Sequence, residues 1–191
     1  MRKEATAYHE AGHVGAQLYF EHTFDHVSIK ADGVSSGRVA GILTERMREI
    51  IIEDTRLPTA EDERYFKHEM ITLMAGGVAQ MEYSGSKRFS KSCQYDFSNL
   101  VLSCGKFSIN GKALYYYSRY IIEEANRLMH LVGMWDFVER LAGQLLIRKE
   151  LTYFECASLY KVMGGLYFNV GSEEVDVNEI NERPAYWRIK S

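Results

Sequence analysis

Two histidines and a glutamate near the amino terminus have the types and the spacing that can activate a water molecule on a metal ion. His9, Glu10 and His13 lie within the segment TAYHEAGH at residues 6–13. On an α-helix of about 3.6 residues per turn, these three side chains share one arc of the surface. Two neutral imidazoles so placed can bind one Zn²⁺. The glutamate can then take a proton from the attacking water and pass it to a leaving amine, which is the chemistry of peptide hydrolysis.

The opposite face of this segment is apolar, as a helix that packs on one side requires. Small and aliphatic side chains recur there at helical spacing: Ala7, Ala11, Val14 and Leu18. Gly12 and Gly15 each cost about 1 kcal/mol of helix propensity relative to Ala, which indicates that another element passes close by. We expect the helix to run from about Lys3 to Tyr19. The alternative is a packing helix whose histidines have this spacing by chance.

The composition is that of a globular protein without a nucleic-acid footprint. The 191 residues are 46% hydrophobic and 26% charged, with a net charge of −3 and a pI near 6.1. No apolar run approaches the roughly 18 residues that cross a bilayer, and no hydrophobic signal region follows the charged start MRKE. We therefore expect a cytoplasmic protein with neither a membrane nor a nucleic acid as partner.

The cysteines and prolines bear on domain organisation. Cys93, Cys104 and Cys156 are odd in number, widely spaced and in no C-x-x-C pair, so we expect reduced packing residues. Only two prolines occur, and no Ser/Gly-rich linker divides the chain. We expect one domain over residues 1–165 and a peripheral, acidic C-terminal extension over residues 166–191.

The patterns predict a mainly helical domain with a small β-hairpin near the helix that carries the histidines. The hairpin strands are expected at His26–Lys30 and at about residues 38–43, with a turn at residues 33–37. Its edge could bind an extended substrate, or the hairpin could only cover the core. Further helices are expected at about residues 44–54, 60–83, 113–130, 136–148 and 152–162. The tyrosines at 115–117 and 120 predict core packing or, as the less favoured alternative, an interface.

Two features suggest how other helices meet the histidines. Gly76-Gly77 lies inside the expected helix at 60–83 and implies close approach by a neighbour, for which we expect the helix of His9. Asp96 opens another amphipathic segment, whose apolar stripe is Phe97, Leu100, Val101 and Cys104. Such an aspartate ordinarily complements the helix dipole. A two-histidine zinc site also needs a third protein ligand, and a carboxylate at the edge of a buried face can supply it.

Several segments, taken in order, resemble the peptidase domain of the FtsH-type, membrane-anchored AAA+ zinc proteases. They are residues 6–13, 26–29, 37–39, 76–82 (GGVAQME), 90–96 (SKSCQYD), 124–125, 141–146 and 150–152. The resemblance spans most of residues 1–162 and implies a mainly helical, FtsH-like zinc peptidase domain that forms a homo-oligomer. By position it makes His9, His13 and Asp96 the zinc ligands. It makes Glu10 the general base.

The sequence also departs from the family pattern. No G-x-x-x-x-G-K-[ST] loop occurs in the 191 residues, so we expect no ATPase of its own, and a separate AAA+ unfoldase would have to be a partner. Val78, Met81 and Tyr95 replace family residues near the expected site, which affects how the ligands are oriented. Glu82 is the alternative third ligand, or it orients a ligating histidine.

Together these observations predict a zinc metalloendopeptidase of the HExxH type. It would hydrolyse peptide bonds in peptides or unfolded protein segments, with Zn²⁺ as its cofactor. The alternative is a zinc-binding, catalytically silent interaction module derived from an FtsH-like peptidase.

Overall fold

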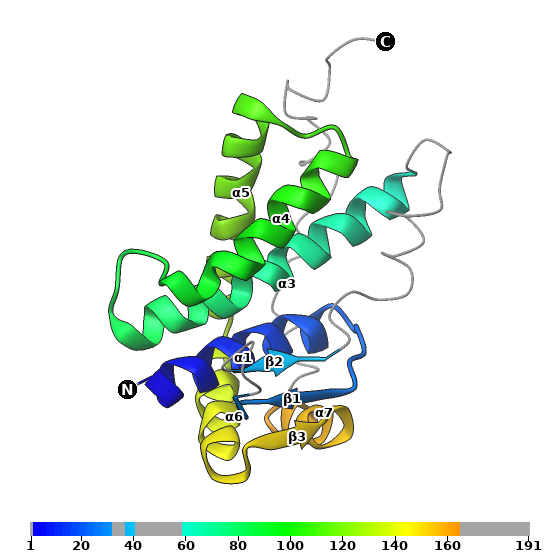
Figure 1. Cartoon of the computed structure of the whole chain (residues 1–191). Helices are drawn as coiled ribbons and strands as arrows, with labels where there is room; N and C mark the ends of the chain where they lie inside the picture. The colour runs from blue at the N-terminus through cyan, green and yellow to red at the C-terminus, as the bar shows by residue number, and fades with distance from the viewer. Residues whose placement is uncertain (1, 32–36, 41–58, 165–191) are drawn as a thin grey trace.

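The computed structural model describes residues 2–31, 37–40 and 59–164 (Figure 1). The expected helix at 44–54, most of the expected turn at 33–37 and the expected extension at 166–191 lie outside these residues. Within them the chain forms six α-helices and a three-stranded antiparallel sheet, so the mainly helical prediction is confirmed. None of the helices in the described ranges combines the length and the apolar character needed to span a membrane.

Helix α1 (Arg2–Tyr19) lies at the centre of the molecule. It packs against α3 (Ala60–Ser84) on one side and against α6 (Met134–Arg148) on the other (Figure 1). Ala7, Ala11 and Val14 on its apolar face are fully buried. The helix that carries both histidines is therefore held from two sides, which limits how far its polar face can move.

Helix α3 runs unbroken through Gly76-Gly77 and is fixed at both ends. At its start, the Thr59 hydroxyl accepts the Asp62 amide, and the Asp62 carboxylate accepts the Thr59 amide at 2.8 Å. It ends at Gly85, whose positive φ of 62° suits glycine. A Cβ on Gly12 of α1 would lie 2.6 Å from the carbonyl oxygen of Ala75. The predicted close approach of the two helices is thereby confirmed.

Helices α4 (Gln94–Lys106) and α5 (Gly111–Met129) also pack against α3 (Figure 1). The short 3₁₀ helix η2 (Lys91–Cys93) leads into α4. Helix α4 confirms the predicted apolar stripe at Leu100 and Cys104 but not at Phe97. Its buried residues are Asp96, Leu100, Ser103 and Cys104, whereas Phe97 is 41% exposed. The first turn of α4 presents Asp96 rather than Phe97 inward because that turn meets the polar face of α1.

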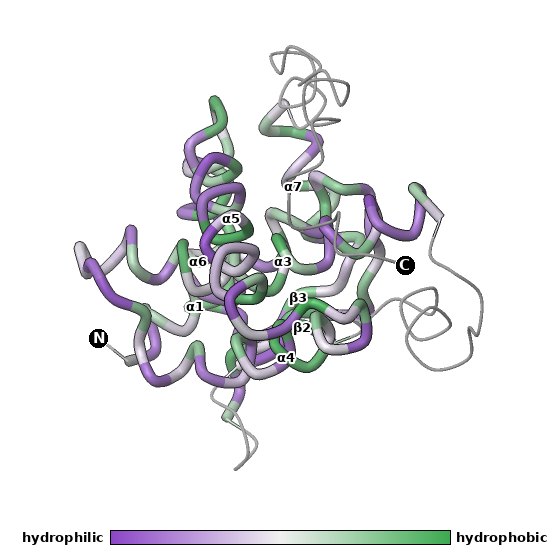
Figure 2. The backbone as a smooth tube through the Cα atoms, turned by 90° about the horizontal axis from the view of Figure 1, so that it is seen from above, coloured by the Kyte–Doolittle hydropathy of each residue, from purple (hydrophilic) through white to green (hydrophobic). Residues whose placement is uncertain are grey.

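Helix α5 is amphipathic, with hydrophilic and hydrophobic residues alternating along its turns (Figure 2). Tyr117 is buried in the core and Tyr120 packs against it in part. Tyr115 is 57% exposed and Tyr116 is 50% exposed. The core prediction for the tyrosine cluster is therefore wrong for these two residues, which lie on the outer face of the helix.

The sheet has the order β2-β1-β3, with β1 (His26–Ser28) in the middle. Val27 of β1 pairs with Val39 of β2 (Arg38–Val39), which confirms the predicted antiparallel pairing of these two segments. Val27 also pairs with Leu151 of β3 (Glu150–Thr152), a strand that the sequence analysis did not predict. Three residues between α6 and α7 (Tyr153–Val162) are too few for a periodic signal, and their partner lies far away in sequence.

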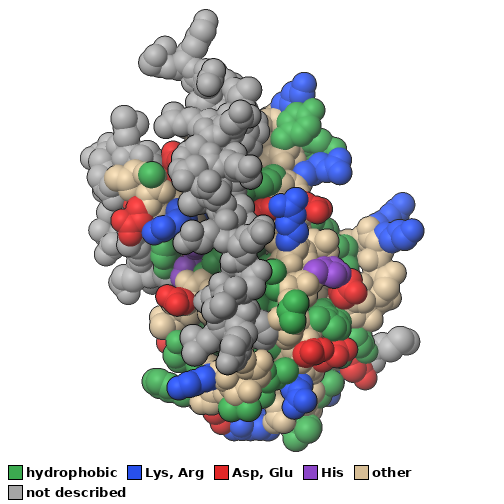
Figure 3. Space-filling model, turned by 180° about the vertical axis from the view of Figure 1, so that it is seen from behind, with side chains coloured by type: hydrophobic (Ala, Val, Ile, Leu, Met, Phe, Trp, Pro, Cys, Tyr) green, Lys and Arg blue, Asp and Glu red, His purple; other side chains and the backbone are tan. Residues whose placement is uncertain are grey.

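Figure 3 shows the face opposite to the view of Figure 1. Among the described side chains on that face, positive and negative residues are interspersed with hydrophobic ones. The described part of this face carries no large patch of one sign, in keeping with a net charge of only −3.

Candidate metal centre

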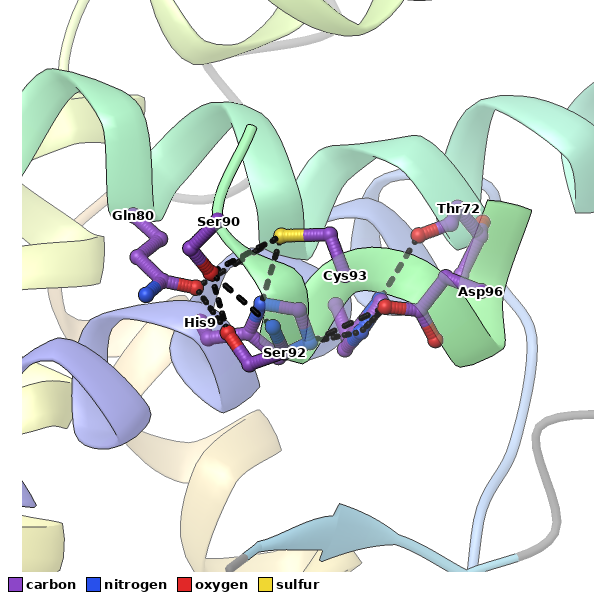
Figure 4. A network of polar contacts seen from close by, with 8 residues as sticks. His9, Thr72, Gln80, Ser90, Ser92, Cys93 and Asp96 are labelled. Carbon is purple, nitrogen blue, oxygen red and sulfur yellow. Dashed lines mark hydrogen bonds and ion pairs between the residues drawn. The ribbon is translucent and has the colours of Figure 1, made fainter. Parts of the chain in front are cut away.

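His9 and His13 of α1 meet Asp96 of α4 in one cluster. Nε2 of His9 lies 3.1 Å from Nε2 of His13 and 3.1 Å from Oδ2 of Asp96, and Nε2 of His13 lies 3.7 Å from the same oxygen (Figure 4). Ligand atoms bound tetrahedrally to Zn²⁺ at 2.0–2.1 Å are about 3.3 Å apart. The three separations lie on either side of this value, so the atoms could hold such an ion.

The chemical environment of the cluster also fits a metal ion. All three residues are buried. Oδ2 of Asp96 is inaccessible to solvent, and the Nε2 atoms of His9 and His13 are the described polar groups that approach it. A buried carboxylate needs a positively charged partner, which is either a protonated imidazole or a metal ion. A cation bound between this oxygen and the two imidazoles would be such a partner, and two His and one Asp form a donor set that suits Zn²⁺.

His13 is held in one orientation by helix α3. Its Nδ1 donates to the carbonyl oxygen of Thr72 at 2.8 Å. This hydrogen bond keeps the proton of the neutral ring on Nδ1, so the lone pair of Nε2 faces the cluster. A backbone carbonyl is a usual partner for a metal-ligating histidine.

His9 has a different partner. Its Nδ1 lies 3.9 Å from Sγ of Cys93, which belongs to the segment that leads into α4 (Figure 4). Cys93 in turn contacts Oε1 of Gln80 at 3.6 Å and the hydroxyl of Ser90 at 3.7 Å. The prediction that Cys93 only packs is therefore incomplete, because it contacts a candidate ligand.

Without a metal ion, His9 and Asp96 form a pair of opposite charges. Burial lowers the pKa of His9, but its hydrogen bonds to Asp96 and Cys93 and the charge of Glu10 raise it to about 10. Burial raises the pKa of Asp96, but the charges of His13 and His9 and their hydrogen bonds lower it by more. The pKa of Asp96 therefore lies below its ordinary value. A metal ion must therefore displace a proton from His9 in order to bind.

Glu10 lies beside the cluster and points toward the sheet. It is 4% exposed, and burial raises its pKa, although His9 and His13 oppose this shift. A Cβ on Gly37, which precedes β2, would lie 2.6 Å from Oε1 of Glu10. Glycine at position 37 thus leaves room for the carboxylate. A carboxylate with a raised pKa is a better proton acceptor near neutral pH than an ordinary one.

Glu82 is not part of the cluster. It is exposed near the end of α3, whereas the described groups whose ligand atoms converge are His9, His13 and Asp96. The structure therefore brings Asp96 to the two histidines. Of the residues that depart from the family pattern, Val78 is buried in the core and Tyr95 is 75% exposed.

A hollow of about 210 Å³ opens next to the cluster. Asp96 and Cys93 form part of its wall. The remainder is largely apolar and includes Leu73, Met74, Gly77, Phe89 and Phe97. The space between α3 and α4 could therefore take an apolar group beside Asp96.

No protein-family model matches the chain, and no curated protein matches it. The function must therefore follow from the residues and their geometry.

Proposed function

We propose that this chain is a zinc-dependent metallopeptidase that hydrolyses peptide bonds in peptides or unfolded protein segments. One observation carries the proposal: the ligand atoms of His9, His13 and Asp96 converge, with Glu10 beside them. A Zn²⁺ ion bound there would activate a water molecule and polarise the scissile carbonyl.

The number of ligands favours a catalytic over a structural site. Structural zinc sites are closed by four protein ligands, whereas catalytic ones have three and keep one position open. The cluster has three members among the described residues. Glu10 has no part in binding the metal, and its buried carboxylate is suited to accept a proton from the attacking water and to pass it to the leaving amine.

The FtsH-like order of motifs supports the same assignment and extends it. On this proposal the domain is FtsH-like, with α1 as its active-site helix. The hollow beside Asp96 offers room for one side chain of a bound peptide. A homo-oligomer and a separate AAA+ unfoldase are the partners that the resemblance suggests.

The test compares the parent protein with Glu10→Gln, Asp96→Ala and Glu82→Gln. We expect Glu10→Gln to keep one Zn²⁺ per chain but to lose cleavage of a quenched, unfolded protein substrate by about 10²- to 10⁴-fold. Asp96→Ala removes a ligand and should lose metal on dialysis. Glu82→Gln is the matched control and should bind metal and cleave like the parent.

The outcomes separate the two candidate functions. Cleavage by Glu10→Gln at the parental rate would refute the role of Glu10. A parent protein that binds one Zn²⁺ but shows no cleavage, with or without a chelator, would instead support the catalytically silent interaction module. A parent protein that binds no Zn²⁺ would refute both.

A further inference from the structure

The two candidate histidine ligands differ in what binds the ring nitrogen that faces away from the cluster. For His13 this partner is the carbonyl of Thr72 at 2.8 Å, which is a strong and fixed acceptor. For His9 it is the sulfur of Cys93 at 3.9 Å. A neutral imidazole that binds a metal through Nε2 must carry its proton on Nδ1, and this N–H needs an acceptor.

The neighbours of Cys93 decide which way its hydrogen points. The thiol donates to Oε1 of Gln80 at 3.6 Å, and the same oxygen accepts the hydroxyl of Ser92 at 3.0 Å (Figure 4). Because the thiol hydrogen is directed to Gln80, the sulfur lone pairs are left for the N–H of His9. A chain of hydrogen bonds with one direction therefore runs from His9 through Cys93 to Gln80.

Helix α3 leaves the space that this arrangement needs. A Cβ on Gly77 would lie 3.2 Å from Sγ of Cys93 and 2.6 Å from the ring of Phe89. Any larger residue at position 77 would push the sulfur or the ring aside. Cys93 itself is only 4% exposed, so water does not readily replace it as the partner of His9.

We propose that Cys93 is a positioning residue of the metal centre: its sulfur accepts the Nδ1 hydrogen of His9, while Gln80 holds the thiol, so that Nε2 of His9 presents its lone pair toward Asp96. This inference rests on the metal centre of the proposed function. It predicts that Cys93 acts through His9 and does not itself bind the ion, because its sulfur contacts Nδ1 while the cluster is formed by Nε2.

The experiment measures Zn²⁺ affinity by competition with a chromophoric chelator, together with the absorption spectrum of the Co²⁺-substituted protein. The variants are Cys93→Ala, Cys93→Ser and Gln80→Ala. The control is Cys104→Ala, which removes another buried thiol, on α4, that takes no part in the network. Unfolding of the chelator-treated proteins shows whether each variant is folded.

We expect Cys93→Ala to weaken Zn²⁺ binding by about 10- to 100-fold, the usual range for loss of an outer partner of a ligating histidine. The Co²⁺ spectrum should change because His9 is reoriented. Cys93→Ser should recover part of the affinity, since a hydroxyl also accepts and donates. Gln80→Ala should cause a smaller loss, and Cys104→Ala should bind like the parent. Should Cys93→Ala fail to fold, the Ser and Gln80 variants still provide the comparison.

Three results would overturn this inference. Parental affinity and an unchanged Co²⁺ spectrum in Cys93→Ala would show that the sulfur does not position His9, while leaving the proposed metallopeptidase intact. Thiolate-to-cobalt charge-transfer absorption in the parent, lost in Cys93→Ala, would make Cys93 a ligand instead. A parent that binds no metal would overturn this inference and the proposed function together.

Discussion

The ring of His13 occupies the space that a side chain at position 76 would need. A Cβ on Gly76 would lie 2.4 Å from Nε2 of His13 and 2.6 Å from its Cε1, well inside van der Waals contact. The atom that faces His9 and Asp96 therefore lies directly against the backbone of α3. One glycine in α3 thus determines both how closely α1 packs and where a candidate ligand can sit.

Replacing Gly76 by Ala should harm the metal centre and the fold together. The added methyl must displace either the imidazole or the helix. We expect the free energy of unfolding to fall by about 1–3 kcal/mol, as for other overpacked cores. Zn²⁺ affinity should fall by about tenfold or more, because Nε2 of His13 leaves its position. Urea unfolding and metal competition titrations measure the two effects.

Gly143 on α6 provides the matched control. A Cβ there would meet no described atom within 4 Å. Gly143→Ala should leave metal binding unchanged and raise the free energy of unfolding by up to about 1 kcal/mol, because Ala favours the helix. Equal metal affinities in both alanine variants would contradict the role assigned to Gly76.

The raised pKa of His9 predicts opposite pH dependences for the metal-free and metal-bound protein. His9 titrates near 6.5 in the unfolded chain and near 10 in the folded, metal-free protein. The folded state therefore binds this proton more tightly, so the stabilisation is complete below pH 6.5 and is lost as pH rises toward 10. Zn²⁺ must displace the proton, so its apparent affinity should rise by up to about tenfold per pH unit.

Two measurements at several pH values from about 6.5 to 8.5 check this expectation: metal titrations, and unfolding curves of the chelator-treated protein. We expect the metal-free protein to become less stable over this range and the metal to bind more tightly. An apparent affinity that levels off just above pH 7 would show that His9 titrates as an ordinary histidine.

A second buried pair lies away from the metal centre. Nδ1 of His22 lies 3.2 Å from Oε1 of Glu69, and the two side chains are 5% and 1% exposed. Removing one partner leaves the other buried without its counter-group. We expect Glu69→Ala to lower the free energy of unfolding by about 3 kcal/mol, because it leaves the buried imidazole of His22 without this partner.

A double-mutant cycle measures that coupling. His22→Ala, Glu69→Ala and the double variant should show a coupling of about 1 kcal/mol or more. The exposed pair of Lys30 and Glu150, with nitrogen and oxygen 3.1 Å apart, is the control and should show less than about 1 kcal/mol. Additive effects at His22 and Glu69 would mean that the contact contributes no stability.

Local sequence predicted what depends on helical periodicity. His9 and His13 share one face of α1 because of their spacing alone, and the glycine pair at 76–77 correctly indicated a close helix neighbour. Helical periodicity alone could not identify Asp96 as a candidate ligand, because no local pattern shows that the first turn of α4 meets α1. Its identification depended on the order of motifs that resembles the FtsH-type family.

Interactions between distant segments were missed. Cys93 gave no signal in the sequence, because its contact with His9 depends on the path of the segment before α4. Only the first turn of the predicted stripe on α4 was wrong, because apolar periodicity favoured Phe97, whereas the polar Asp96 is buried. Strand β3 is three residues long and exists only through its pairing with β1. Such features follow from tertiary structure, which periodicity does not encode.

The pairing of β3 with β1 bears on how the protein is made. Residues 9, 13 and 96 leave the ribosome well before residues 150–152, which complete the sheet beside α1, and α6 also follows them. A nascent chain would therefore expose all three candidate ligand side chains while the supports that align them are still being synthesised. Because contacts between distant segments form late in folding, we expect zinc to be acquired after translation of the domain rather than during elongation.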